Sequence, residues 1–231
     1  MSGRLPTLLR AYRIFSAAAT PFTALFLARR LRRGKEHRLR LSERRGVSGM
    51  ARPPGPLVWV HGASVGELLS VLPLIERIRA RELNILVTSG TVTSSGLAEQ
   101  RMPRGVIHQF VPLDTPMFVR RFLEHWQPDL ALFVESELWP NIIVETSRRE
   151  VPMMLINARL SETSFRRWRY LPATIVSLLR RLDLCLARSA ADAPEIDGVV
   201  HVQGSGEFAP GDRLHVKVVK SDAHDLWARI Q

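Results

Sequence analysis

The sequence lacks the features that define several common classes of protein. It has one cysteine, Cys185, so no internal disulfide framework is possible and a reducing compartment is indicated. His201, His215 and His224 stand at no metal-ligand spacing with that cysteine, so we expect no metal site and no cofactor. The glycine-containing stretch HGASVGE has neither the Lys-Ser/Thr pair of a P-loop nor the G-x-G-x-x-G spacing of a dinucleotide site.

Acidic residues are scarce at the beginning of the chain. Residues 1–52 contain 13 Lys and Arg but only Glu36 and Glu43 as acids, so the net charge of +11 lies entirely in this segment. The rest of the chain is neutral. A neutral body argues against a surface built for nucleic acid, so we expect no nucleic-acid partner for it.

Long apolar runs are also missing. Residues 14–28 carry no charge, but they are only 15 residues long and contain Pro21, which disfavours a transmembrane helix. The arginines that follow disfavour a signal peptide, because they resist translocation. An apolar segment backed by arginines suits an anchor on an anionic, cytoplasmic membrane face. Residues 1–45 are therefore predicted to be a membrane-anchoring helix and basic segment, with a plain surface helix as the alternative.

Strand and helix patterns alternate after the linker-like residues 46–56. The apolar runs that read as strands are Leu57–Val60, Ile85–Thr88, Val106–Val111, Leu130–Val134, Met153–Ile156 and Leu182–Ala187. Helical patterns cover residues 67–81, 116–126 and 165–181. This alternation predicts an α/β fold with a parallel, Rossmann-like sheet over residues 46–187. Ligands of such sheets bind at the carboxyl ends of the strands, which here carry most of the polar motifs.

The remaining residues, 188–231, have a different character. Two short strands are expected, at Val199–Val202 and Leu214–Val219, joined by turns rich in Gly and Pro and without a helix. The sequence therefore predicts a short β tail attached to an α/β body.

HGASVGE, residues 61–67, follows the first predicted strand. Gly62 and Gly66 permit a tight strand-to-helix turn, and Glu67 then falls in the first turn of the next helix. The helix dipole stabilises a carboxylate there, which favours a capping role, but the same position suits a general base above the sheet. Both interpretations of Glu67 stay open from spacing alone. His61 is equally consistent with orienting Glu67 and with a buried structural role.

FVESELWPN and INARLSETS follow two later strands. Glu135 and Glu137 come directly after an apolar run, where carboxylates are costly to bury unless they are paired or in use; a solvated loop is the simpler alternative. Asn157 and Arg159 lie just past the next strand, and Arg159 is suited to hold an anion such as a phosphate. Ser161 is a candidate helix cap.

These motifs stand in an order, and at spacings, that resemble the 3-deoxy-D-manno-octulosonic acid (Kdo) transferases. The resemblance rests on HGASVGE, TSGTVTSSG, PLDTP, ELWPN and NARLS and covers about residues 8–187. It implies the acceptor-binding half of a GT-B glycosyltransferase, which transfers Kdo from CMP-Kdo to a lipid A precursor on the cytoplasmic face of the inner membrane. By the same resemblance Glu67 is the general base and Glu135 stabilises the transition state. The candidate acceptor-binding residues are Ser64, Gly66, Asn157 and Arg159.

The tail resembles a different family. Residues 188–231 are similar to the C-terminal end of the radical-SAM methylthiotransferases that modify a ribosomal protein, where this stretch belongs to a small RNA- or protein-binding β-barrel, the TRAM domain. The Fe–S cysteines of that family are absent. The tail stands where a Kdo transferase has its CMP-sugar-binding domain, so we expect no transfer by this chain alone. A non-enzymatic RNA- or ribosome-binding module and a non-functional fusion product are the alternatives.

Overall fold

A six-stranded sheet forms the centre of the molecule. The computed structural model describes residues 5–92, 95–96, 101–135, 138–158, 166, 168–187, 200–203, 216–221 and 226–230. The central strands are β1 (Leu57–His61), β2 (Asn84–Ser89), β3 (Ile107–Phe110), β4 (Leu130–Val134), β5 (Met153–Ala158) and β6 (Leu184–Ala187). They pair in parallel in the order β3-β2-β1-β4-β5-β6. The predicted Rossmann-like α/β sheet is therefore confirmed, and each predicted strand overlaps an observed one.

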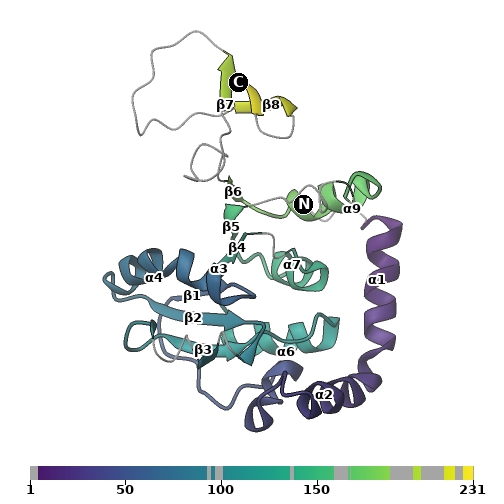
Figure 1. Cartoon of the computed structure of the whole chain (residues 1–231), viewed down its shortest axis with the longest axis vertical. Helices are drawn as coiled ribbons and strands as arrows, with labels where there is room; N and C mark the ends of the chain where they lie inside the picture. The colour runs from purple at the N-terminus through teal and green to yellow at the C-terminus, as the bar shows by residue number, and fades with distance from the viewer. Residues whose placement is uncertain are drawn as a thin grey trace.

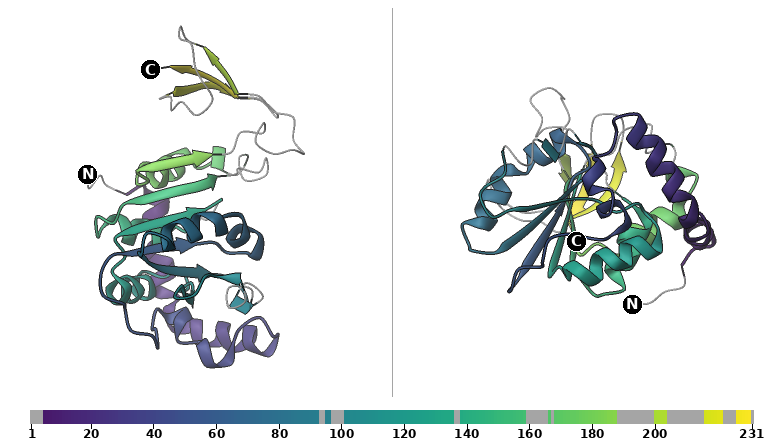
Figure 2. Two further views of the ribbon diagram at one scale, coloured as in Figure 1. Left: turned by 90° about the vertical axis from the view of Figure 1, so that its left-hand side faces the viewer. Right: turned by 90° about the horizontal axis from the view of Figure 1, so that it is seen from below.

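Helices cover both faces of this sheet (Figure 1 and Figure 2). One face carries α3 (Val65–Ser70) and α4 (Leu72–Arg79); the other carries α6 (Pro116–Trp126), α7 (Pro140–Ser147) and α9 (Pro172–Leu179). The sequence predicted one helix over residues 67–81, but the structure breaks it at Val71. Pro73 lies in the first turn of α4, where a missing N–H costs nothing, whereas inside a continuous helix it would remove a hydrogen bond.

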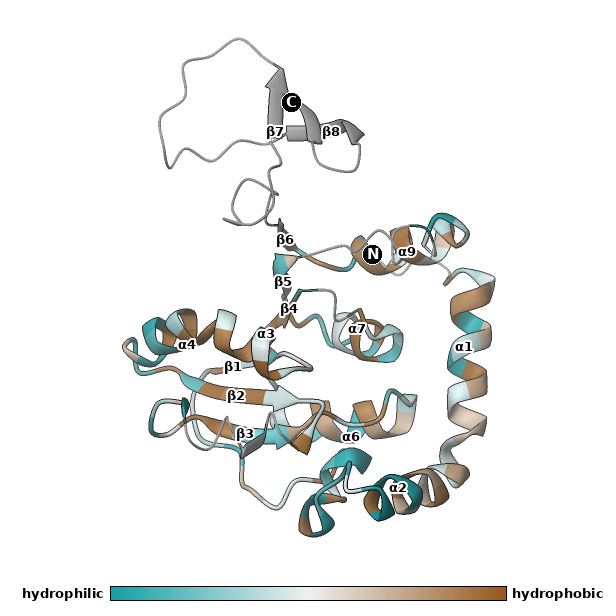
Figure 3. Ribbon diagram, viewed as in Figure 1, coloured by the Kyte–Doolittle hydropathy of each residue, from teal (hydrophilic) through white to brown (hydrophobic). Residues whose placement is uncertain are grey.

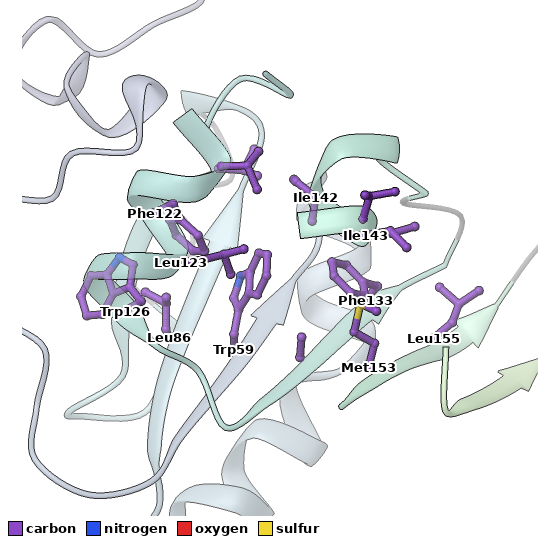
Figure 4. Close-up of a cluster of buried hydrophobic side chains, with 14 of the residues drawn as sticks. Trp59, Leu86, Phe122, Leu123, Trp126, Phe133, Ile142, Ile143, Met153 and Leu155 are labelled. Carbon is purple, nitrogen blue, oxygen red and sulfur yellow. The ribbon is translucent and has the colours of Figure 1, made fainter. Parts of the chain in front are cut away.

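Alternation along β1 builds a core on each face. Leu57 and Trp59 belong to the cluster formed with α6 and α7, drawn in Figure 4, while Val58 and Val60 belong to the cluster formed with α3 and α4. Fully burying each such side chain contributes roughly 1.5–3 kcal/mol. Trp59 also places its indole N–H 2.8 Å from Thr88 Oγ1, so this large ring is buried with its polar atom satisfied.

The N-terminal residues form a bent pair of helices. α1 (Thr7–Ala18) is joined to α2 (Thr23–Arg32) by a short 3-10 turn at Thr20–Phe22, which contains Pro21. No single helix among the described residues has the length and apolar character to cross a membrane, and α1 with residues 20–32 passes that test only as a pair bent by 49°. Figure 3 shows apolar residues along both helices.

α1 is also built into the body. It lies against α6 and α7, outside the layer that these two helices form on the sheet (Figure 2). Leu9 is buried in the same core cluster as Trp59. The segment predicted as an anchor therefore contributes to the fold of the domain that follows it.

The tail forms a small sheet of its own. β7 (Val200–Gln203), β8 (Val216–Ser221) and β9 (Leu226–Ile230) pair in the order β7-β9-β8, with β7 parallel and β8 antiparallel to β9. The two strands predicted here overlap β7 and β8. The sequence analysis missed β9, although Leu226, Ala228 and Ile230 alternate with two larger side chains in the strand pattern.

Candidate functional site

Three neighbouring strand ends bring the main candidate residues together. Glu67 lies in α3 after β1, Glu135 directly follows β4, and Asn157 is near the end of β5. Asn157 Nδ2 lies 3.3 Å from Ser70 Oγ and 3.5 Å from Glu135 Oε1. Ser70 in turn donates a hydrogen bond of 2.7 Å to the backbone carbonyl of Glu67. A line of polar contacts thus crosses the carboxyl edge of the sheet, from α3 to the end of β4.

The geometry at Glu67 supports the capping interpretation. Ser64 is the N-cap of α3, and its hydroxyl accepts a hydrogen bond of 3.3 Å from the backbone N–H of Glu67. Glu67 Oε2 accepts a bond of 2.7 Å from the backbone N–H of Ala63. This is close to a capping box, in which two otherwise unsatisfied donors are paired reciprocally. Glu67 Oε1 accepts no hydrogen bond from the described residues, so capping leaves one oxygen for a substrate donor.

The two glycines of HGASVGE differ in what they do. A Cβ on Gly62 would lie 3.0 Å from Leu68 Cδ2 and 3.2 Å from Glu67 Cβ, so the turn needs a small residue there. A Cβ on Gly66 would meet no atom within 4 Å. Of these two positions, packing against the described residues therefore requires a glycine at Gly62 alone, while Gly66 leaves open space beside the first turn of α3.

The backbone at Glu135 and Asn157 is in the left-handed region. Their φ angles are +60° and +52°, which asparagine tolerates better than glutamate does. Such conformations cost of order 1 kcal/mol each and persist where the surroundings enforce them. Here the Glu135 N–H donates to the Ile156 carbonyl at 2.9 Å, which holds the turn after β4 against β5. The left-handed conformation changes the direction of the Glu135 and Asn157 side chains at the ends of β4 and β5. It makes the carboxyl edge of the sheet a candidate functional site.

Asn157 has hydrogen-bonding capacity to spare. Its Oδ1 is buried and has no hydrogen-bond partner in the described part of the chain. A buried acceptor left unsatisfied costs about 1–3 kcal/mol, so a donor from a ligand would be favoured at this position. A sugar hydroxyl is a donor of the required kind.

The described contacts of His61 are those of a buried structural residue. Its ring is fully buried, and its Nδ1 lies 2.9 Å from Thr88 Oγ1 on the neighbouring strand. Trp139 packs against the core near this ring, with the ring centroids 6.5 Å apart. Trp139 thus packs on the face of the sheet that carries α7.

Asp114 of the PLDTP motif holds the beginning of α7, the helix that follows the Glu135 loop. Its carboxylate accepts hydrogen bonds from the backbone N–H groups of Asn141 and Ile142, at 3.2 and 2.9 Å, and from the Tyr12 hydroxyl at 2.8 Å. Burial raises the pKa of Asp114, and these bonds oppose the rise. The carboxylate caps α7, the helix that follows the Glu135 loop. Sequence analysis used PLDTP only for the family resemblance and gave no signal for the contact between Asp114 and Asn141, 27 positions away.

Asn141 of the ELWPN motif is a joint between α7 and α1. Its Nδ2 donates to Ser16 Oγ at 3.0 Å, and its Oδ1 accepts from Arg13 at 3.1 Å. Arg13 also forms an ion pair with the buried Glu145. Asn141, which belongs to a motif that carries the family resemblance, therefore binds the N-terminal helix α1 to α7.

Part of the basic segment faces inward. Arg44 is 3% exposed; it pairs with Glu36 at 2.8 Å and donates to the carbonyls of Val111 and Gly90 at 3.1 and 2.6 Å. Arg40 pairs with Glu43 at 2.7 Å. The arginines expected to meet a membrane are thus divided, and some of them hold loops of the body.

Several predicted site residues lie outside the described residues: Arg159, Glu137 and Ser161. Within the part of the chain that the structure does describe, no group of three or more His, Cys, Asp or Glu side chains is arranged to hold a metal ion. The site as described consists of two carboxylates, one amide and the hydroxyls of Ser64 and Ser70.

Comparison with known proteins identifies the family. The model of the 3-deoxy-D-manno-octulosonic-acid transferases matches residues 39–204. The chain belongs to this family. The resemblance found in the sequence is confirmed, and the family consists of glycosyltransferases. A TRAM domain model matches residues 179–230, in agreement with the likeness noted for the tail.

Individual Kdo transferases are also similar to the chain. The probable mitochondrial Kdo transferase of Arabidopsis thaliana is 42% identical over 161 residues, which are 69% of this chain and 36% of that protein. The Kdo transferase of Rickettsia felis is 39% identical over 138 residues, 59% of this chain and 30% of its own length. That of Haemophilus influenzae is 34% identical over 155 residues, or 66% and 36%. The matched stretch spans about a third of the length of these relatives.

Proposed function

We propose that this chain provides the acceptor-binding side of Kdo transfer in lipopolysaccharide biosynthesis. The donor would be CMP-Kdo and the acceptor a lipid A precursor, as the family resemblance implies. The observation that carries the proposal is the convergence of Glu67, Glu135 and Asn157 at neighbouring strand ends. Such edges are where doubly wound sheets bind ligands, and two acids with a buried amide acceptor suit a sugar hydroxyl.

Each of the three residues has a distinct task in this proposal. Asn157 Oδ1 accepts a hydrogen bond from the acceptor sugar and fixes its orientation. Glu67 Oε1 takes the proton of the attacking acceptor hydroxyl. The oxygen of that hydroxyl bonds to the anomeric carbon of Kdo, and CMP leaves with the electrons of the broken bond. Glu135 stabilises the positive charge that develops on the sugar ring. Ser64 and Gly66 shape the approach to Glu67, and Arg159 is the candidate partner for an acceptor phosphate.

The proposal is confined to the acceptor side. The described residues form one doubly wound sheet and a small β tail, and donor binding in a GT-B enzyme requires a second domain across the cleft. That the chain alone transfers no Kdo stays a prediction, to be tested by incubating it with CMP-Kdo and acceptor.

We also propose contact with the cytoplasmic face of the inner membrane. Several large apolar side chains of α1, the bend and α2 point to solvent: Ile14, Phe15, Phe22 and Leu25. Exposed cations without a described partner follow them: Arg29, Arg32, Arg33, Lys35 and Arg38. The two acids of the segment are occupied, Glu36 by Arg30 and Arg44, and Glu43 by Arg40. An apolar face bordered by cations alone fits an anionic bilayer surface.

Acceptor binding is the direct test. Titration with the bisphosphorylated glucosamine disaccharide of the acceptor is expected to give saturable binding, and Asn157→Ala is expected to weaken it about tenfold, the effect of one hydrogen bond of roughly 1.5 kcal/mol. Asn84→Ala is the matched control, because Asn84 begins β2 at the opposite edge of the sheet. No saturable binding, or equal losses in both variants, would contradict the proposal.

The role of Glu67 needs a separate experiment. In a complete two-domain relative, replacing the matching glutamate by glutamine is expected to abolish transfer while acceptor binding and folding are retained. Glutamine can still accept the cap hydrogen bond from the backbone, so the substitution separates the two roles. Near-normal turnover would leave Glu67 with the cap alone.

The TRAM match favours a second candidate function, in which the tail binds RNA or a ribosomal component. A salt-dependent RNA-binding assay distinguishes the two, because phosphate contacts weaken steeply with salt. Tight, salt-sensitive RNA binding without acceptor binding would favour this candidate over the first.

A further inference from the structure

A groove of about 600 Å³ lies between the bend that joins α1 to α2 and the first turn of α6. Ala17, Pro21 and Ala24 line it on the side of the bend, and Met117 lines it on the side of α6. Thr20 and Thr23 line it as well, so the groove is an open and mainly apolar depression in the surface. Figure 1 shows α2 running beside α6 at this end of the molecule.

Two arginines give the groove a positive charge. Arg45 and Arg120 both line it, and both are exposed. Arg45 has no side-chain hydrogen bond or ion pair among the described residues, and Arg120 makes one bond, from Nε to the Pro116 carbonyl at 3.1 Å. Glu36 and Glu43, the only acids in the first 52 residues, are held by other arginines. Nothing nearby in the N-terminal segment neutralises these two guanidinium groups.

The groove is continuous with the surface proposed to meet the membrane. Phe22 is 71% exposed and Leu25 73% exposed, and Phe22 lies in the same bend as Pro21. A lipid in the bilayer beneath these residues would reach the groove without leaving the interface. Its phosphate would lie at the level of the arginines, whose guanidinium groups form strong, charge-assisted hydrogen bonds with phosphate.

The groove lies away from the cluster proposed to bind the acceptor. Arg45 ends the 3-10 turn Glu43–Arg45, which lies against β3 and α6. Glu67, Glu135 and Asn157 gather at the ends of β1, β4 and β5, and β2 separates β3 from these strands. The residues that line the groove are therefore separate from those proposed to meet the attacking sugar hydroxyl.

We propose that this groove binds one anionic glycerophospholipid of the bilayer. The phosphate pairs with Arg45 and Arg120, and the beginning of one acyl chain lies along Ala17, Ala24 and Met117. The inference rests on the proposed membrane contact and makes it specific. A bound lipid bridges the bend and α6, so it fixes how the carboxyl edge of the sheet is presented to the membrane.

Monomeric short-chain lipid tests the site without a bilayer. Dihexanoylphosphatidylglycerol, kept below its micelle concentration, is expected to bind saturably at one site, followed by calorimetry and by NMR shifts of the Met117 methyl group. Arg45→Gln and Arg120→Gln are each expected to weaken binding about tenfold, as expected for loss of one charge-assisted hydrogen bond. Ala24→Trp fills the groove, leaves both arginines in place, and is expected to block binding.

Matched controls separate the site from general charge. Arg33 and Arg38 are exposed, have no described partner and do not line the groove. Arg33→Gln and Arg38→Gln are expected to leave the affinity for monomeric lipid unchanged while lowering the affinity for anionic vesicles. Unfolding midpoints in urea show that each variant is folded.

Several results would overturn the proposal. Equal binding of dihexanoylphosphatidylcholine would remove the role of charge, and equal binding of glycerophosphate would remove that of the acyl chain. Competition by the acceptor disaccharide would show that the groove serves the acceptor instead. The membrane proposal fails separately if the unaltered protein does not sediment with anionic vesicles. Saturable lipid binding that is unaffected by Arg45→Gln, Arg120→Gln and Ala24→Trp would place the lipid elsewhere.

Discussion

The N-terminal segment has an inner and an outer face that differ in what surrounds their arginines. The inner arginines, which contact the body, are Arg13, Arg40, Arg44 and Arg52. The outer arginines, which are exposed and have no partner among the described residues, are Arg29, Arg32, Arg33 and Arg38. Both sets come from the first 52 residues, where positive charge predominates. The difference shows that a cluster of positive charge in a sequence does not by itself indicate a binding surface.

The inner arginines are held by hydrogen-bond acceptors, carboxylates and backbone carbonyls, that the rest of the fold leaves unsatisfied. The guanidinium of Arg44 reaches a carboxylate and two backbone carbonyls, and its carbon lies 4.7 Å from the centre of the Phe110 ring. Arg40 lies 4.6 Å from the same ring centre. Burying a charge costs several kcal/mol unless such partners repay it, so these arginines are structural. The arginines of the outer face have no partner in the described part of the chain and are available to a surface outside it.

The largest effect is expected from Arg44→Met. The substitution leaves Glu36 and the carbonyls of Val111 and Gly90 short of a donor, so the free energy of unfolding should fall by about 3–5 kcal/mol. Arg38→Met, on the outer face, should change it by about 0.5 kcal/mol or less. Urea unfolding of both variants measures the contrast, and similar values for the two would remove the distinction between the faces.

Gly46→Ala comes next. Gly46 has a φ of +74°, and a Cβ there would clash with the backbone carbonyl of Phe118. The chain can cross the first turn of α6 so closely only without a side chain. Strain and clash together should cost about 2 kcal/mol. Gly34→Ala is the control: Gly34 has a similar φ of +67° but nothing within 4 Å of its Cβ position, so it reports the backbone strain alone.

Acid should loosen the inner face through His108. Burial, followed by the charges of Arg40 and Arg44, lowers the pKa of His108 from its ordinary 6.5 to about 3. Because the folded pKa is depressed, the stability that this group contributes is present above pH 6.5 and is lost as the pH falls toward 3. The slope should approach about 1.4 kcal/mol per pH unit within that window. Urea unfolding from pH 4 to 7 measures it, and an equal slope in His108→Gln would contradict the assignment.

Alkali should act on the contact between α1 and the body. Burial, then the charge and hydrogen bond of Asp114, raises the pKa of the Tyr12 hydroxyl above its ordinary 10.0. The stability that this group contributes is present below pH 10 and is lost as the pH rises through the raised value. Tyr12→Phe should cost about 1 kcal/mol at neutral pH and remove this alkaline loss. Absorbance of phenolate at high pH shows whether Tyr12 ionises late.

The smallest effect on stability is expected on the outer face. Replacing Arg29, Arg32, Arg33 and Arg38 together by Gln should change the free energy of unfolding by about 0.5 kcal/mol or less. Binding to anionic vesicles should nevertheless weaken by about 1 kcal/mol for each arginine replaced, so the fraction that sediments with the vesicles should fall strongly. Undiminished sedimentation would assign membrane contact to the apolar side chains alone.

The sequence by itself determined the sheet, the break at Pro21 and the cap of α3. Strand alternation, helical periodicity and proline geometry act over a few residues, so they are visible without coordinates. The spacing of Ser64 and Glu67 likewise places a serine three residues before a glutamate at a helix start, and the structure forms nearly the corresponding capping box. The order of the motifs was sufficient to identify the family.

Only the tertiary structure decided which polar side chains serve the fold. Asp114 meets Tyr12 across 102 positions of sequence and Asn141 across 27, and no local pattern announces either contact. Arg44 turns inward while Arg38 does not, because the carbonyls of Gly90 and Val111 and the carboxylate of Glu36 lie within its reach. The physical reason is that a charged side chain is buried only where the rest of the fold leaves hydrogen-bond acceptors unsatisfied, and those acceptors come from distant parts of the chain.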